Sequence, residues 1–360
     1  MNQPTNDYSG LTRDPYTFQP MDPTATMSPS ANRELPDGWP GSLTVCVALA
    51  GARASGKSLY VAVLVKLLRQ LADEHGVVMK PANRQTKDSY AVNYENPFFE
   101  EMGLLSSTPP VSSAEAYQRD PLIYDLGFHV INGGEQQKVF LVLRDVAGED
   151  LESLPEDQSV LDFFQWAHEV VYLFDPLKVS EIRLLLEGTV SAESLGADAT
   201  DVLNNLLQVI RPGALAHEGR PLPRLAVALS KFDTLRSLAN SANEGWAEIM
   251  GNRGAAFNRQ LEPPYWGSDP ELLNEEIRSM LLRLDARTLL NTVRQEAEIY
   301  GMDVRYFVNS SLGSQPQGSR LDRTGIAPFR VLDPVLWLLY DAGIFRPTTE
   351  IRQQRGEQWL

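Results

Sequence analysis

Eight residues near the start of the chain, 51–58, read GARASGKS and follow the apolar run SLTVCVALA. The two glycines, Gly51 and Gly56, allow the backbone to curl so that successive N–H groups point at one anion. Lys57 would place an ammonium group on the β- and γ-phosphates of a nucleotide, and Ser58 would offer a hydroxyl to Mg²⁺. The spacing therefore predicts a phosphate-binding P-loop rather than a strand–turn–helix with a coincidental pair of glycines.

The middle of this loop consists of Ala52, Arg53, Ala54 and Ser55. Their backbone N–H groups would complete the phosphate cradle, together with the N-terminus of the helix that is expected to begin at Lys57. The guanidinium of Arg53 has three open roles: contact with a phosphate, contact with a partner, or exposure to solvent. We favour solvent exposure for this side chain.

A second stretch, RDVAGED at 144–150, follows another apolar run. Asp145 would end that strand, where a carboxylate can hold Mg²⁺ through water. Gly148 could present its N–H to a γ-phosphate, and Glu149 comes next. The same residue types are common in ordinary strand-end turns, so this stretch alone leaves both interpretations open.

Two further stretches would recognise the base, and both follow apolar runs. In SKFD, at 230–233, the carboxylate of Asp233 can accept hydrogen bonds from the N1–H and 2-amino groups of guanine, while the stem of Lys231 lies along the base. In VNSS, backbone N–H groups at Ser310 and Ser311 would meet the guanine O6. A solvated loop is the alternative interpretation of SKFD taken alone.

Together these stretches resemble the Ras-like, translation-factor-related class of P-loop GTPases. The P-loop, the Asp-x-x-Gly turn, the Ser-Lys-x-Asp base reader and the final Asn-Ser-Ser loop occur in the order of that class. The wide spacing and the ending LDPVLWLLYDAG are most similar to the bacterial double-GTPase-type family, over roughly residues 42–345. The resemblance implies GTP or GDP as the ligand, Mg²⁺ as the cofactor, and hydrolysis of GTP to GDP and phosphate.

The sequence departs from the usual motifs of that class at several positions. Ser230 stands where Asn or Thr is usual, Ser311 replaces alanine, and Glu149 replaces the glutamine that orients water. Because an ionised Glu149 would lie beside an anionic phosphate, slow intrinsic hydrolysis is expected. No motif identifies the threonine that senses the γ-phosphate; Thr108 is the first candidate and Thr86 the second. The metal-ligand candidates are thus Ser58, Thr108 and Asp145, and the catalytic candidates are Lys57, Gly148 and Glu149.

Strand-like and helix-like patterns alternate along the chain. The short Asn-Gly-Gly turn at 132–134 can join only antiparallel neighbours. We therefore predict an α/β fold: a three-layer P-loop NTPase sheet, mostly parallel with one antiparallel edge strand, plus a helical insertion. The expected strands are 42–50, 121–131, 138–146, 169–176, 224–233 and 303–311, and helical patterns occur at 57–76, 180–211 and 270–300.

The predicted domain organisation follows from composition. Residues 1–40 are polar, proline-containing and without a period, which predicts a disordered arm that is dispensable for nucleotide binding. The GTPase domain would span 41–345, with the helical insertion at about 234–302, and 346–360 would form a tail. Residues 77–121 are expected to form a long, loop-like connection.

Composition also limits the partners. A net charge of −15 repels nucleic acid and anionic lipid, so no nucleic-acid partner is expected. Cys46 is the single cysteine, so one chain cannot form a disulfide, and the four histidines lack zinc-ligand spacing. We see no signal peptide and no apolar stretch long enough to span a membrane, so a cytoplasmic location is expected.

Three functional hypotheses remain open. The first is a GTP-dependent switch whose loops are ordered by GTP and Mg²⁺ and whose turnover is set by a protein regulator or effector. The second is an ATP-dependent motor or small-molecule kinase, which the base-reading stretch and the hairpin disfavour. The third is a nucleotide-bound or empty scaffold that presents its helical insertion to a partner. Pairing of two copies of the chain across the nucleotide is a further open possibility.

Overall fold

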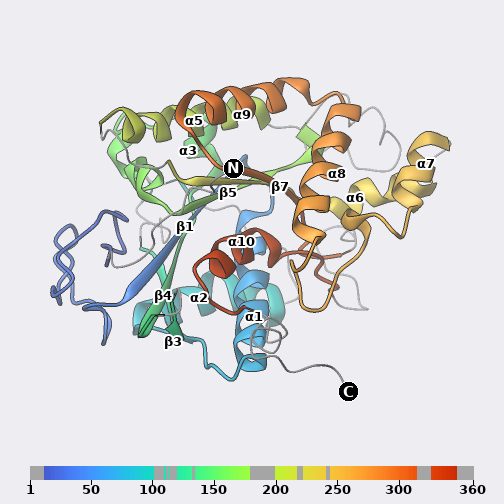
Figure 1. The fold of residues 1–360 in the computed structure, drawn as a ribbon. Helices are drawn as coiled ribbons and strands as arrows, with labels where there is room; N and C mark the ends of the chain where they lie inside the picture. The colour runs from blue at the N-terminus through green and yellow to red at the C-terminus, as the bar shows by residue number, and fades with distance from the viewer. Residues whose placement is uncertain are drawn as a thin grey trace, which may run out of the picture.

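The computed structural model has a central seven-stranded β-sheet with helices on both faces (Figure 1). Thr108, the first candidate sensor of the γ-phosphate, lies outside the residues that the structure describes. Residues 180–198 of the helical pattern expected at 180–211 also lie outside them. The described residues are 12–100, 109–110, 113, 120–131, 134–178, 199–216, 222–240, 244–313 and 326–346.

The strand order in the sheet is β2-β3-β4-β1-β5-β6-β7. From β4 to β7 the neighbouring strands are all parallel, so their carboxyl ends meet at one edge of the sheet. These strands are β4 (Gln136–Arg144), β1 (Leu43–Gly51), β5 (Glu169–Phe174), β6 (Arg224–Leu229) and β7 (Val304–Val308). Every residue of β1, β5 and β6 is buried, as expected for apolar strands between two helical layers. The predicted α/β class is confirmed.

The antiparallel part of the sheet begins with the predicted hairpin. Strand β3 (Leu122–Val130) runs antiparallel to β4, with Leu122 opposite Leu143. However, β3 is not the edge strand, because the two-residue strand β2 (Lys80–Pro81) pairs antiparallel with it. The predicted single antiparallel strand is therefore β3, but the edge position predicted for it is wrong, because β2, which runs in the direction of the parallel strands, forms that edge.

The connection between α1 (Lys57–Glu74) and β3 contains helical structure, contrary to the loop expected over 77–121. Helix α2 (Arg84–Tyr90) begins where the Asn83 side chain accepts a hydrogen bond from the backbone N–H of Thr86, at 2.7 Å. A π-helix follows directly at Ala91–Glu100. The polar, proline-containing composition concealed these helices, because their buried residues are few and lie on one side only.

The remaining helices form the two outer layers of the fold. One face of the sheet carries α1, α2 and α10, and the other carries α3, α5 and α9; α6, α7 and α8 lie beyond β7 (Figure 1). The helical pattern expected at 270–300 is divided between α8 and α9 at Asp285, whose φ of 60° interrupts the helix. The helices are α1 (Lys57–Glu74), α3 (Gly148–Glu152), α5 (Ala199–Ala216), α6 (Phe232–Arg236), α7 (Glu244–Gly251), α8 (Asp269–Arg283), α9 (Arg287–Tyr300) and α10 (Asp333–Asp341). Within the described part of the chain, no helix combines the length and apolar character needed to cross a bilayer.

The segment 12–40 is an ordered part of the domain, so the prediction of a disordered arm is wrong for these residues. The carboxylate of Asp14 organises the segment, because it accepts hydrogen bonds from the N–H of Tyr16 and the hydroxyl of Ser28, both at 2.7 Å. Phe18 and Trp39 are completely buried. A few buried aromatic rings and one carboxylate that satisfies local donors are enough to order a segment whose average composition is polar.

Removal of residues 1–40 is therefore expected to destabilise the protein, whereas the composition had predicted a disordered arm that is dispensable for nucleotide binding. Loss of a buried Phe or Trp side chain costs about 3–5 kcal/mol. We expect Phe18→Ala to lower the free energy of unfolding by about that amount, while Met27→Ala, at a side chain 41% exposed, changes it by less than about 1 kcal/mol. Urea unfolding of the two variants measures this, and equal stabilities would show that the segment is loosely held.

Candidate nucleotide-binding site

The GARASGKS loop has the shape of a phosphate cradle. It connects β1 to α1, and Gly56, the residue that caps α1, has a φ of 93° that L side chains rarely adopt. The first N–H groups of α1 have no carbonyl within the helix to bond, and the positive end of the helix dipole lies with them. Backbone geometry and helix position therefore favour an anion at this point, as predicted from the spacing.

Lys57 folds back over its own loop. Its ammonium group donates hydrogen bonds to the carbonyl oxygens of Gly51, at 2.7 Å, and Ala52, at 3.0 Å. The side chain is 5% exposed. Burial lowers the pKa of Lys57, and the negative charges of Asp145, Glu152 and Asp150 offset part of this effect. The lysine is thus held in the loop by weak carbonyl acceptors, which a phosphate group could replace.

Helix α3 lies directly against this loop. A Cβ atom added to Gly148 would come within 2.2 Å of the backbone nitrogen of Arg53, so only glycine permits this approach. The same backbone N–H donates to Oε1 of Glu152 at 2.7 Å. The Asp-x-x-Gly turn and the P-loop, separated by about ninety residues in the sequence, are therefore in contact.

Solvent exposure was the favoured role for the Arg53 side chain, but the structure also gives this side chain a partner. Its guanidinium Nη1 lies 2.8 Å from Oε1 of Glu149, with side chains 58% and 37% exposed. An ion pair this exposed contributes at most about 1 kcal/mol. Arg53 and Glu149 can therefore separate at little cost when a more strongly charged group enters the loop.

Asp145 is a buried carboxylate whose burial is only partly compensated by Lys57, the Val146 backbone N–H and the Ser58 hydroxyl. It follows β4, is 5% exposed, and neither of its oxygens meets a donor in hydrogen-bond geometry among the described residues. Burial raises the pKa of Asp145 to about 6, and the charge of Lys57 and the nearby Ser58 hydroxyl offset only part of that rise. A buried carboxylate left in this condition is costly unless a ligand satisfies it.

The donor set at this point fits Mg²⁺. Hard divalent cations prefer carboxylate and hydroxyl oxygens and usually complete their coordination with water and nucleotide phosphates. The carboxylate of Asp145 and the hydroxyl of Ser58 supply such oxygens beside the P-loop. The residues present are therefore those that Mg²⁺ and a nucleotide would need, although Thr108, the third candidate ligand, is not among the described residues.

The burial of the Asp145 carboxylate leads to a prediction on stability. The pKa of Asp145 in the folded protein, about 6, lies above the value of about 3.9 expected in the unfolded chain. The folded state then binds more protons between pH 4 and 6, so stability falls as pH rises through this window, by up to about 3 kcal/mol. Nucleotide-free Asp145→Asn should be more stable than the wild type at pH 7.5, with the difference shrinking to about 1 kcal/mol by pH 4.5.

Urea unfolding at the two pH values tests this prediction. Glu156→Gln, at an exposed carboxylate shortly after α3, is the control and should match the wild type at both. An asparagine variant that is less stable than the wild type at pH 7.5 would contradict the prediction. It would show that the Asp145 carboxylate is already compensated.

The base-reading residues predicted at the ends of β6 and β7 come together. The hydroxyl of Ser310 donates to Oδ1 of Asp233 at 2.5 Å, and itself accepts from the N–H of Gly313 at 2.8 Å. Ser311 follows in a bend and is partly buried. The second carboxylate oxygen of Asp233 is not used in this contact, so the side chain is oriented but retains acceptor capacity.

Lys231 is fixed in an unusual backbone conformation. Its φ is 52°, in the left-handed region, and its ammonium group lies 2.8 Å from Oδ2 of Asp175, whose side chain is completely buried. The hydroxyl of Ser230, at the position that departs from the usual motif, donates to the carbonyl of Phe174 at 3.3 Å. The serine thus ties β6 to the end of β5 instead of projecting toward a base.

Thr86, the weaker candidate for the γ-phosphate sensor, is placed elsewhere. It is completely buried, and its hydroxyl accepts a hydrogen bond from the backbone N–H of Ile123 at 3.0 Å. A threonine committed to holding α2 against β3 cannot report on a phosphate. The candidacy of Thr86 is therefore wrong.

Comparison with a curated relative identifies the family of this chain, although no family model matches it. A curated relative from Mycolicibacterium smegmatis (strain ATCC 700084 / mc(2)155), named "Putative ESX-1 scaffolding and assembly protein SaeC", is 42% identical over 326 residues. The match covers 89% of this chain and 81% of the relative. The chain belongs to the SaeC family.

Solved structures show more distant similarity. The GTPase-like domain of S. cerevisiae Ski7, bound to GTP, is 10% identical with a TM-score of 0.33; the match covers 86% of this chain and 52% of that chain. The signal recognition particle receptor SRb in its GDP–Mg form, from Chaetomium thermophilum, is 11% identical with a TM-score of 0.25, covering 76% and 93%. SRb in the GTP/SRX complex from the same organism is 14% identical with a TM-score of 0.27, covering 75% and 94%.

Sequence reasoning missed three polar groups in this SaeC-family chain. Asp175 ends β5 in the way that Asp145 ends β4, and that position was a usable signal. Glu152, which accepts from the P-loop amide of Arg53, carried no signal, because this contact joins residues far apart in the sequence. Asn309 is 1% exposed, and its side-chain nitrogen has no acceptor within the described residues, which marks a buried donor next to Ser310.

Proposed function

We propose that this chain is a guanine-nucleotide-binding scaffold. It binds GTP or GDP with Mg²⁺, and the bound nucleotide stabilises the form that assembles with partner proteins. The observation that carries the proposal is the buried carboxylate of Asp145, only partly compensated by its surroundings, beside the P-loop lysine. The scaffold role is supported by the relative's name, which describes scaffolding and assembly.

The phosphates would lie at the N-terminus of α1. The N–H groups of the loop between Gly51 and Ser58 would surround them, and Lys57 would leave the carbonyls of Gly51 and Ala52 to contact the β- and γ-phosphates. Ser58 and Asp145 would hold Mg²⁺, whose charge neutralises the phosphates when it is bound. Binding would also remove the cost of the buried Asp145 carboxylate.

The base would lie between the ends of β6 and β7. Asp233, oriented by Ser310, would accept hydrogen bonds from the N1–H and 2-amino groups of guanine. Lys231, oriented by Asp175, would lie along the base. The buried amide of Asn309 supplies a further donor that a purine oxygen could satisfy. This arrangement favours guanine over adenine, which presents the opposite donor and acceptor pattern.

Slow turnover is part of the proposal. The position that would orient the attacking water is occupied by Glu149, which is ion-paired to Arg53 at 2.8 Å. An ionised carboxylate accepts hydrogen bonds but cannot donate one to a phosphate oxygen. A hydrolytic switch is the second candidate function, because Gly148 contacts the P-loop and a partner could supply the missing group.

Glu149→Gln tests the slow-turnover claim. We expect single-turnover hydrolysis by the wild type at or below about 10⁻³ s⁻¹, the scale of an unassisted GTPase. The glutamine variant should hydrolyse GTP at the same rate or up to about tenfold faster, because the amide can both donate and accept. Quenched reactions, separated into GTP and GDP, measure both rates, with Glu156→Gln as the control. A tenfold or larger fall in Glu149→Gln would show that Glu149 acts as a base and that the protein is a competent enzyme.

A further inference from the structure

We propose that the short segment 256–259, between α7 and α8, positions both halves of the base-reading site and couples guanine binding to the helical lobe. The helical lobe is defined here as residues 244–283, which include α7 and α8. The inference rests on the proposed guanine site. It adds a route by which the lobe, the surface that the scaffold would offer to a partner, responds to the nucleotide.

The first half of the base site is tied to this segment by Arg236. Arg236 lies on α6, one turn after Asp233, and its guanidinium donates to the side-chain oxygen of Asn258 at 3.4 Å and to the Asn258 carbonyl at 3.1 Å. The same guanidinium lies 4.0 Å from the ring centre of Phe329. The orientation of α6, and hence of Asp233, therefore depends on where Asn258 lies.

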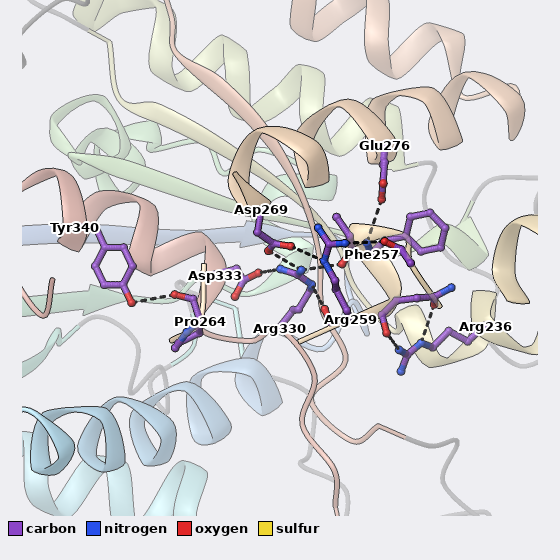
Figure 2. Close-up of polar contacts among 12 residues, drawn as sticks. Arg236, Phe257, Arg259, Pro264, Asp269, Glu276, Arg330, Asp333 and Tyr340 are labelled. Carbon is purple, nitrogen blue, oxygen red and sulfur yellow. Dashed lines mark hydrogen bonds and ion pairs between the residues drawn. The ribbon is translucent and has the colours of Figure 1, made fainter. Parts of the chain in front are cut away.

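The second half is tied to the same segment by Arg330. Ser310, which orients Asp233, forms a two-hydrogen-bond bridge with Phe329, at 3.0 and 2.8 Å. The next residue, Arg330, donates to the carbonyl of Ala256 at 2.7 Å and to that of Arg259 at 2.9 Å. Figure 2 shows Arg330 and Arg236 converging on the stretch that contains Phe257 and Arg259.

Arg330 is also locked in place by charge. Its side chain is 1% exposed and is ion-paired with Asp269, at 2.7 Å, and with Asp333 (Figure 2). Removal of one partner from such a buried cluster leaves an uncompensated charge and is strongly destabilising. Arg330 therefore acts as a rigid link between the Ser310 loop, α8 and α10.

The segment is hydrogen-bonded to both helices of the lobe. The amide of Asn258 donates to the carbonyls of Met250, at 2.7 Å, and Asn252, at 3.0 Å, at the end of α7. On the other side, the N–H of Phe257 donates to Glu276 of α8 at 3.2 Å. A displacement of α7 or α8 is therefore transmitted to both Asp233 and Ser310. By linkage, if one position of the lobe strengthens guanine binding by some factor, guanine binding favours that position of the lobe by the same factor.

Binding measurements on the positioning contact test the inference. Arg236→Ala removes both hydrogen bonds to Asn258, whereas Asn258→Ala removes the side-chain one together with the bonds from Asn258 to Met250 and Asn252. Each is expected to weaken GDP binding about tenfold, the effect of about one hydrogen bond, and to reduce the preference for GDP over IDP, which lacks the 2-amino group. Affinity for pyrophosphate with Mg²⁺ should be unchanged, because it needs only the P-loop. The effects of the two single variants should be less than additive in the double variant, since the bond between Arg236 Nε and the Asn258 side chain is lost in both.

Arg278→Ala is the matched control. Arg278 lies on α8 and forms an exposed pair with Glu275, with side chains 53% and 65% exposed. This variant should bind GDP, IDP and pyrophosphate as the wild type does. Arg236→Lys keeps the charge near Phe329 but loses the forked geometry, so it should fall between wild type and Arg236→Ala.

Hydrogen exchange on the wild type decides the point even where a variant fails to fold. Amides of 254–260 should exchange at least about threefold more slowly with GDP and Mg²⁺ than with pyrophosphate and Mg²⁺. Equal exchange with the two ligands, or an unchanged preference for GDP over IDP in Arg236→Ala and Asn258→Ala, would overturn the coupling. Failure of the proposed function gives a different result: the wild type itself would then bind GDP no better than pyrophosphate or IDP.

Discussion

Replacement of Asp233 by asparagine is expected to weaken GTP binding by about 10²–10⁴-fold and to strengthen binding of xanthosine triphosphate. In our account the Asp233 carboxylate accepts from the N1–H and 2-amino groups of guanine. The side-chain NH2 of an asparagine would place a donor against one of these two donors. Xanthine keeps N1–H but carries an oxygen where guanine has its amino group, so it matches the amide pattern.

The structure makes this substitution a clean test. The amide oxygen of asparagine can still accept the hydrogen bond that Ser310 now donates to Oδ1 of Asp233. The loop should therefore keep its shape while the recognition pattern changes. Asp285→Asn, at a carboxylate 62% exposed and far along the chain from the site, is the control and should bind GTP normally. Unchanged binding of both triphosphates by Asp233→Asn would mean that this carboxylate does not read the base.

Replacement of Lys57 by alanine is expected to reduce affinity for GTP and GDP by about 10²-fold or more. Hydrogen bonds to charged groups contribute about 1.5–3 kcal/mol each, and the ammonium would contact two phosphates. The structure adds a stability effect that the motif does not predict. Because the lysine is buried and donates to the carbonyls of Gly51 and Ala52, its loss should also cost about 1–3 kcal/mol.

Two comparisons separate binding from stability in this test. Lys57→Met retains much of the side-chain volume and should recover part of the stability without recovering affinity. Lys66→Ala, on the same helix at a side chain 42% exposed, should bind nucleotide as the wild type does. Fluorescent-nucleotide titration and urea unfolding give the two quantities. A folded Lys57→Ala variant with undiminished affinity would be incompatible with the P-loop interpretation.

The features that could be predicted from the sequence have local causes. The glycine spacing before Lys57, the short turn between β3 and β4, and the acidic residues that end apolar strands each depend on a few neighbouring residues. Parallel strands then bring their carboxyl ends to one edge, which is why the residues that follow β1, β4, β6 and β7 could be assigned to one site. The contact between Asp233 and Ser310 follows from that topology alone.

The features that were missed depend on contacts between distant segments. Residues 12–40 look disordered by composition, yet Phe18 and Trp39 are buried. The partner of Arg53 is about a hundred residues away, and no local pattern could reveal it. The links from Arg236 and Arg330 to the segment 256–259 depend on how the helical lobe packs, which neither periodicity nor a motif specifies.

Direct titration of the purified wild type with GTP, GDP and ATP, each with and without Mg²⁺, tests the central claim. The account predicts that GTP and GDP bind with Kd values of about 10 μM or tighter in the presence of Mg²⁺, corresponding to about 7 kcal/mol. ATP should bind at least about 10²-fold more weakly, and removal of Mg²⁺ should weaken GTP. Equal binding of ATP and GTP, or no binding of any of the three, would contradict the proposal that this SaeC-family chain is a guanine-nucleotide-binding scaffold.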